Sequence, residues 1–173
     1  MQVSKLESSR RQLETVISMY FAEGDPVSMH TLTAAAYNVL RNINTKIGGN
    51  PMLIKDQLVN LAPSEYTKQV RDRINEAENF FKHADRDHQA ILEFNPELTE
   101  YLIMDACDKY REIAGEYPHL MAIFRAWMMM TNQDIFNLTV DQLTLLSKSS
   151  NELVIGGKAE YFRDMLAALL LST

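Results

Sequence analysis

Residues 95–115 read NPELTEYLIMDACDKYREIAG, and this stretch decides the fold class. Asn95, Pro96 and Glu97 together form a helix start, because an Asn can cap, a proline suits the first turn, and an acid there complements the helix dipole. Apolar residues then occupy more than one side of the helix: Leu98, Tyr101, Leu102, Ile103, Ala106, Cys107, Tyr110 and Ile113. We therefore predict a buried central helix over residues 96–115.

The same helical spacing continues outward from this stretch in both directions, with Gly, Pro and Asn at the breaks. Further helices are expected over residues 4–23, 26–47, 52–61, 63–84, from 118 onward, 140–148 and 158–171. Residues 52–61 are expected to lie over the surface. No set of alternating strands is present. The chain is therefore predicted to be all-α, a single-domain helical bundle of about six to eight helices over residues 1–173.

The helix near residue 26 has two alternative starts. Asp25 caps it with Pro26 in the first position, or Ser28 caps it with Val27 packed against Leu32. The spacing of these residues favours neither alternative.

The composition is that of an ordinary globular domain. Hydrophobic residues make up 46% of the 173 residues and charged residues 23%, so the chain can bury a core without a disulfide or structural metal. The lone Cys107 is expected to be a small buried side chain. The N-terminus lacks a signal-peptide core, and the apolar run over residues 165–171 is too short to span a membrane. We therefore expect a cytoplasmic location and no membrane partner.

The net charge and the surplus of apolar residues limit the kinds of partner that we expect. The net charge is −6, and 17 basic residues are scattered among 23 acidic ones, so an extended nucleic-acid surface is not expected. Met128, Met129 and Met130 cannot all face one core, and the neighbours Phe80 and Phe81 present the same problem. This surplus predicts a homo-oligomer, most simply a dimer, or a helical protein partner.

The most polar stretch is residues 79–88, NFFKHADRDH, which contains two of the four histidines. Seven candidate site residues lie in it or just before it: Asp72, Glu76, Asn79, His83, Asp85, Asp87 and His88. The first four share one stripe of a helix, since they are four, three and four residues apart. Such oxygen and imidazole groups suit a divalent Mn, Fe or Zn ion, with His83, Glu76 and Asp87 as ligands. The alternative is surface pairing, with Asp85 or Asp87 capping the next short helix.

Two residues of an earlier helix extend this candidate site. His30 and Tyr37 lie seven residues apart, on one face of the helix that begins near residue 26. If that helix packs beside the polar stripe, both residues complete the site, with His30 as a fourth metal ligand.

Two stretches of the chain resemble known proteins. Residues 25–32 (DPVSMHTL) followed by 79–87 (NFFKHADRD) resemble a group of small helical bacterial proteins with no assigned function. A weaker likeness is to the HEPN domains, helical bundles that include RNases, whose motif is Arg, a polar residue, and His a few residues later. Asn79 and His83 match the second half of that motif, but Glu78 stands at the Arg position. The missing cation would have steadied the scissile phosphate, so RNase activity is in doubt.

Three functions follow from these observations, and the chain carries no nucleophile elbow or Rossmann glycine pattern to add an enzyme class to them. The first is a helical binding or regulatory domain. The second is a divalent-metal-binding bundle centred on His83, with or without enzyme activity. The third is a degenerate HEPN-like RNase. The sequence does not name a substrate or ligand for any of them.

Overall fold

A computed structural model describes residues 1–85, 88–136, 138–142, 144 and 154–171. Within these ranges the chain forms helices and connecting segments and no β-strand, which confirms the all-α prediction. The described part also contains no helix that is both long enough and apolar enough to cross a membrane.

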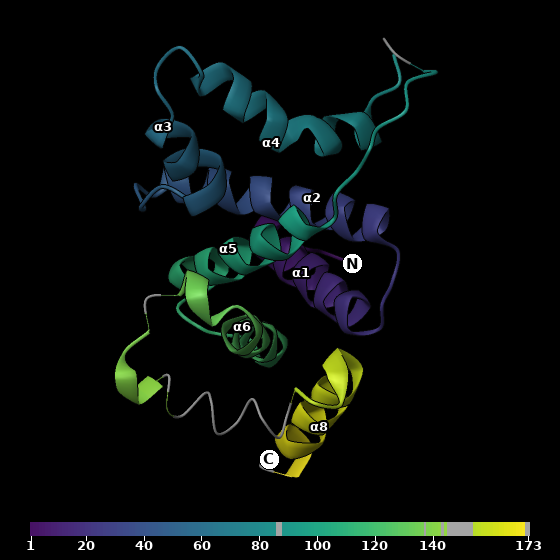
Figure 1. Cartoon of the computed structure of the whole chain (residues 1–173), viewed down its shortest axis with the longest axis vertical. Helices are drawn as coiled ribbons and strands as arrows, with labels where there is room; N and C mark the ends of the chain where they lie inside the picture. The colour runs from purple at the N-terminus through teal and green to yellow at the C-terminus, as the bar shows by residue number, and fades with distance from the viewer. Residues whose placement is uncertain (86–87, 137, 143, 145–153, 172–173) are drawn as a thin grey trace.

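Helix α5 (Glu97–Ala114) is the centre of the bundle, as predicted. It packs against α1 (Lys5–Phe21), α2 (Pro26–Lys46) and α6 (His119–Thr131) (Figure 1). Its buried residues include Leu102, Ile103 and Cys107, and burial raises the pKa of the Cys107 thiol. The helix ends at Gly115, whose φ of 72° lies in the left-handed region that favours glycine.

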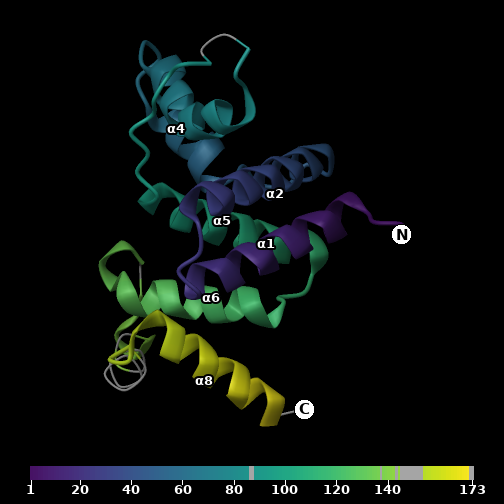
Figure 2. The same ribbon diagram turned by 90° about the vertical axis from the view of Figure 1, so that its right-hand side faces the viewer.

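On one side of this centre, α6 and α8 (Gly157–Leu171) form the next two layers (Figure 2). Phe21 of α1 packs against Trp127 of α6 and stacks on Phe162 of α8, at ring-centroid distances of 6.0 and 4.5 Å. Tyr161 is buried and donates to the Ile123 carbonyl at 2.9 Å. Aromatic contacts therefore hold α8 to the bundle.

On the opposite side, α4 (Thr67–Lys82) forms the outermost layer (Figures 1 and 2). It packs against α2 and the short α3 (Val59–Leu61). Its apolar residues Val70, Ile74, Ala77 and Phe81 are half-buried, and Glu78 is the buried residue of α4. The face turned inward includes Glu78 because a buried lysine of the bundle pairs with its carboxylate.

The N-terminus of α2 resolves the two alternatives left by the sequence. Asp25 is the cap, since its Oδ2 accepts a hydrogen bond from the Ser28 amide at 2.7 Å and Pro26 takes the first helical position. In the preceding turn, Glu23 and not Gly24 takes the positive φ, 54°. Gly24 is used for close approach instead, because a Cβ there would lie 3.1 Å from the Cβ of Met19.

The segment predicted as a surface helix over residues 52–61 is not a regular α-helix, and part of it is buried in the bundle. It forms a π-helical turn, η1 (Leu53–Leu58), followed by α3, and it buries Met52, Ile54 and Lys55. Further along, Thr139 and Gln142 form a capping box, with reciprocal hydrogen bonds of 2.9 and 3.3 Å. Most of the helix predicted over residues 140–148 lies outside the described residues.

Candidate functional site

A groove of about 1250 Å³ runs along the outer side of α4 and is closed on its other side by residues 90–92. Residues 90–92 belong to the connection that passes alongside α4 before α5 (Figure 1). The groove contains five of the residues predicted from the sequence: Asp72, Glu76, Asn79, His83 and Asp85. The predicted polar stripe therefore lines a real concavity.

Three other predicted residues, His88, His30 and Tyr37, are not in the groove. Asp87 lies outside the described residues, and His88 is exposed and does not line the groove. His30 and Tyr37 are buried inside the bundle, with partners of their own. The prediction that α2 adds these two side chains to the polar stripe finds no support in this geometry.

The predicted metal ligands His83 and Glu76 both line the groove, whereas the third, Asp87, falls in the part of the chain that is not described. Among the described residues, no three His, Cys, Asp or Glu side chains are grouped so that they could hold a metal ion. The three-ligand prediction therefore stays a prediction.

The carboxylates of α4 in the groove are paired within their own helix. Asp72 pairs with Lys68 four residues earlier, and Glu76 pairs with Arg73 three residues earlier. The Asp72 and Glu76 side chains are 59% and 44% exposed. Exposed pairs of this kind contribute about 0–1 kcal/mol each. A ligand that brings its own cations can therefore replace Lys68 and Arg73 at little cost.

Apolar side chains line the rest of the groove. Val70, Ile74 and Phe80 come from α4, and Ile91 and Leu92 come from the facing segment. Ile91 is 94% exposed, so almost none of its apolar surface is buried by this chain. The groove thus combines uncovered apolar surface with acidic groups.

An aromatic cluster lies beneath the groove and connects its two sides. Phe81 of α4 packs on Phe94 with ring centroids 5.1 Å apart, and both rings pack edge to face on His30, at 5.8 and 5.3 Å. Phe80, which lines the groove, contacts Phe81 at 6.0 Å. The imidazole Nδ1 of His30 is 2.9 Å from the Thr99 hydroxyl of α5. These contacts set the distance between α4 and residues 90–92.

Sequence reasoning missed a second set of polar residues, which joins α4 to the bundle. The Lys55 ammonium of η1 is buried, pairs with Glu78 and donates to Asn38 at 3.2 Å. Lys82 also pairs with Glu78, at 2.7 Å. Burial lowers the pKa of Lys55. Burial raises that of Glu78, but hydrogen bonds from Lys55 and Lys82 outweigh this and leave it lowered. The lowered pKa keeps the Glu78 carboxylate charged at neutral pH, where it pairs with Lys55 and Lys82.

Polar side chains also hold the irregular η1 segment in place. Asp105 of α5 accepts hydrogen bonds from the amides of Leu53 and Ile54, at 3.2 and 3.0 Å. Tyr37 donates to Asp105 at 2.5 Å and accepts from the Lys55 amide at 3.1 Å. Burial and the neighbouring Asp105 raise the pKa of Tyr37, so its phenol stays protonated. Tyr37 is a structural residue here.

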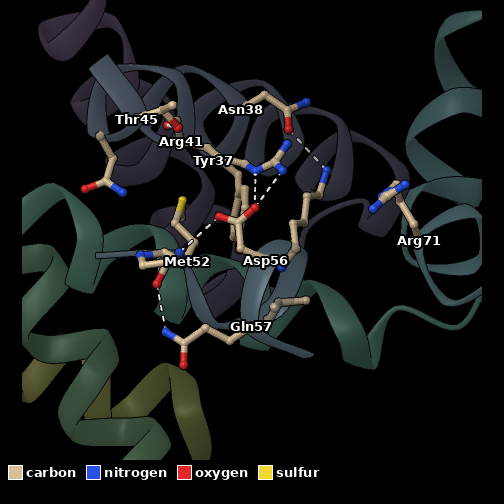
Figure 3. A network of polar contacts seen from close by, with 12 residues as sticks. Tyr37, Asn38, Arg41, Thr45, Met52, Asp56, Gln57 and Arg71 are labelled. Atoms are coloured by element: carbon tan, nitrogen blue, oxygen red, sulfur yellow. Dashed lines mark hydrogen bonds and ion pairs between the residues drawn. The ribbon is translucent and has the colours of Figure 1, made fainter. Parts of the chain in front are cut away.

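The outer edge of the same segment is fixed by an ion pair. Figure 3 shows Arg41 and Asp56 facing each other, with Met52 beside them. The Arg41 Nη2–Asp56 Oδ1 distance is 2.6 Å, and Asp56 also accepts from the Met52 amide at 3.1 Å. In the sequence, the signal for this polar set was charge beside or inside an apolar run, Lys55 and Asp56 in MLIKD and Asp105 in LIMDAC.

No family model, no curated protein and no solved structure matches this chain. The two resemblances drawn from the sequence therefore stay predictions. Glu78, which stands where a HEPN motif has Arg, is the buried acid that pairs with Lys55 and Lys82. An arginine there would place a third cation against two lysines, so the acid at this position has a structural reason.

Proposed function

We propose that this protein is a binding module that accepts a basic, amphipathic peptide helix in the groove along α4. The observation that carries the proposal is the combination in one groove of apolar surface, including the nearly fully exposed Ile91, with the carboxylates Asp72, Glu76 and Asp85. A helix laid in a groove with its apolar face inward is a common mode of peptide recognition.

Size favours a peptide over a small metabolite. The groove holds about 1250 Å³, above the roughly 300–1,000 Å³ typical of small-molecule pockets. Its lining runs along α4 from Gln69 to His83. At a rise of 1.5 Å per residue this is about 21 Å, the length of a partner helix of roughly 14 residues.

Charge selects the kind of peptide. Among the described residues that line the groove, Asp72, Glu76 and Asp85 carry carboxylates and Arg73 carries a guanidinium. A partner with Lys or Arg beside its apolar residues complements this balance, whereas an acidic partner is repelled. Charge complementarity of this kind acts mainly on specificity and on the association rate, so binding should weaken as salt rises.

The test is titration with a synthetic helix of about 14 residues, with leucines three and four residues apart and lysines elsewhere. We expect a Kd in the micromolar range and chemical-shift changes confined to α4 and residues 90–92. Ile91→Glu and Glu76→Lys should each weaken binding by about tenfold or more, or 1.4 kcal/mol. A peptide with glutamates in place of the lysines should not bind.

Matched controls exist in the same chain. Ile155 is 84% exposed and far along the sequence from the groove, so Ile155→Glu should leave the Kd unchanged. Glu160 pairs with Arg163 three residues away, as Glu76 does with Arg73, so Glu160→Lys repeats the charge change outside the groove. Equal binding of the basic and acidic peptides, or shifts that map to α8, would overturn the proposal.

A divalent-metal site is the second candidate function, favoured by the shared groove position of Glu76, Asn79 and His83. Elemental analysis of the untagged protein, with thermal melts in metal and in chelator, tests it. Stoichiometric Mn, Fe or Zn with a melting temperature that drops in chelator and in His83→Ala would support the site. A metal-free protein whose melt ignores chelator would dismiss it.

We also propose that the protein forms a homo-oligomer and is located in the cytoplasm. A homo-oligomer is supported by α8, on which Leu170 and Leu171 are exposed. A cytoplasmic location is supported by Cys107, the single cysteine of the chain, which is a free thiol buried in the core.

A further inference from the structure

His30 is a buried titratable group with an unsatisfied atom. It is 1% exposed, and its Nε2 has no hydrogen-bond partner among the described residues. Its Nδ1 is held by Thr99 at 2.9 Å. A neutral imidazole tolerates this environment, with its free nitrogen against aromatic rings. An imidazolium would carry a charge and a second N–H donor there, which is costly without a partner.

The rings around His30 are those that connect the two sides of the groove. Phe81 belongs to the α4 side and Phe94 to the segment that carries Ile91 and Leu92. Both rings contact the imidazole and each other. A change that separates Phe81 from Phe94 therefore breaks a contact between the two segments that line the groove.

The charges around His30 oppose its protonation. The groups that act on it are Lys55 from η1 and Glu78 and Lys82 from α4, two cations and one anion, while α5 presents the neutral Thr99. Burial and then Lys55 lower the pKa of His30 below its ordinary value of 6.5. The stability that the neutral His30 imidazole contributes to the fold is therefore complete above pH 6.5. It is lost as the pH falls through the lower pKa that His30 has in the folded state.

We propose that His30 makes the groove pH-sensitive: its protonation separates Phe81 from Phe94 and loosens residues 90–94 from α4. The loosening concerns this chain alone, and only its consequence, release of a bound peptide in acid, rests on the proposed function. The group that titrates lies outside the groove, so it acts on the groove without touching the ligand.

The experiment is hydrogen exchange on the full chain at pH 7.5 and 5.5, corrected for intrinsic rates, in the wild type and in His30→Gln. In the wild type, amides of residues 79–83 and 90–94 should lose protection at pH 5.5 by up to about tenfold, the limit that one pH unit of linkage sets for one proton. Amides of α1 and α6 should not change. His30→Gln, which stays neutral, should show no pH-dependent loss.

The basic peptide described above is titrated in parallel. Its affinity should fall by about fivefold or more between pH 7.5 and 5.5 in the wild type, and by clearly less in His30→Gln. Both proteins keep His83, so its direct effect on a cationic peptide cancels in the comparison. His119→Asn, at an exposed histidine on the opposite side of the bundle, is the matched control and should behave as the wild type.

The outcomes separate the two proposals. Acid loosening in the wild type with no peptide binding at any pH supports the His30 proposal and ends the proposed function. Peptide binding together with pH-independent hydrogen exchange supports the proposed function and overturns the His30 proposal. If His30→Gln does not fold, the imidazole titration of the wild type by NMR decides. A His30 that titrates at or above 6.5 without moving the Phe81 and Phe94 resonances overturns the proposal.

Discussion

At the scale of single residues, the chain buries a charged residue, Lys55, that follows an apolar run in the sequence. Lys55 has a side chain only 4% exposed, and its partner Glu78 is the buried residue of α4. Breaking a buried pair by removing one partner costs about 3–5 kcal/mol, whereas replacing both partners by apolar groups is often neutral. The same chain offers an exposed pair for comparison.

We predict that Lys55→Met lowers the free energy of unfolding by about 3 kcal/mol, because Glu78 keeps only Lys82 as a cationic partner. The double variant Lys55→Met/Glu78→Met should recover most of that loss. Lys68→Met, which removes an 85% exposed side chain from the pair with Asp72, should change stability by less than about 0.5 kcal/mol. Urea unfolding measures all three, and equal losses at Lys55 and Lys68 would contradict the assignment of a buried pair.

At the scale of elements, the outer helix α4 and the segment η1 depend on side chains from other helices. The first amides of η1 have no acceptor within their own segment. Two of them donate to the carboxylate of Asp105 in α5, some fifty residues away. No local cap in the sequence performs this task, since Met52, at the cap position, makes no side-chain hydrogen bond. Tertiary contacts therefore determine the irregular π-helical geometry of η1.

We predict that Asp105→Ala destabilises the fold by about 2–4 kcal/mol, since it leaves two amides and the Tyr37 hydroxyl without their acceptor. Asp105→Asn keeps one acceptor oxygen and should cost less. Circular dichroism during thermal unfolding ranks the two variants. Asp141→Ala, at an exposed helical position after Thr139, serves as the control and should be nearly neutral.

At the scale of the whole molecule, the layers end in two different surfaces. One outer layer, α4, presents the acidic and apolar groove. The other, α8, has no charged residue over its last seven positions, 165–171, and keeps Leu170 and Leu171 exposed. An apolar helical face of this kind at the edge of a bundle is suited to packing against its own copy.

We predict a homodimer through α8, with a mass in solution about twice the chain mass of 19.8 kDa by light scattering after gel filtration. Leu170→Lys should yield a monomer because it places a charge in the apolar face. Leu61→Lys, at an equally exposed leucine (79%) on α3, should leave the dimer intact. A wild-type monomer at micromolar concentration, or a dimer that survives Leu170→Lys, would contradict this interface.

The methionine triplet shows how far sequence patterns reach. Met128 and Met130 are buried and Met129 is half-buried, in contact with Arg125, as expected if three successive residues of a helix cannot share one face. The polar stripe was likewise predictable, because Asp72, Glu76, Asn79 and His83 need only helical spacing to align. The groove was not, because its other side, Ile91 and Leu92, comes from a connection with no periodicity to place it.

The sequence by itself determined the all-α class and the central helix, predicted over residues 96–115 and found at Glu97–Ala114, since both depend on neighbours within a few residues. Only the tertiary structure decided that Asp25 caps α2, that Glu78 turns inward, that His30 packs in an aromatic cluster and not beside the polar stripe, and that Asp105 caps η1. The reason is physical: burial and pairing of a charge depend on partners tens of residues away, and local spacing carries no information about them.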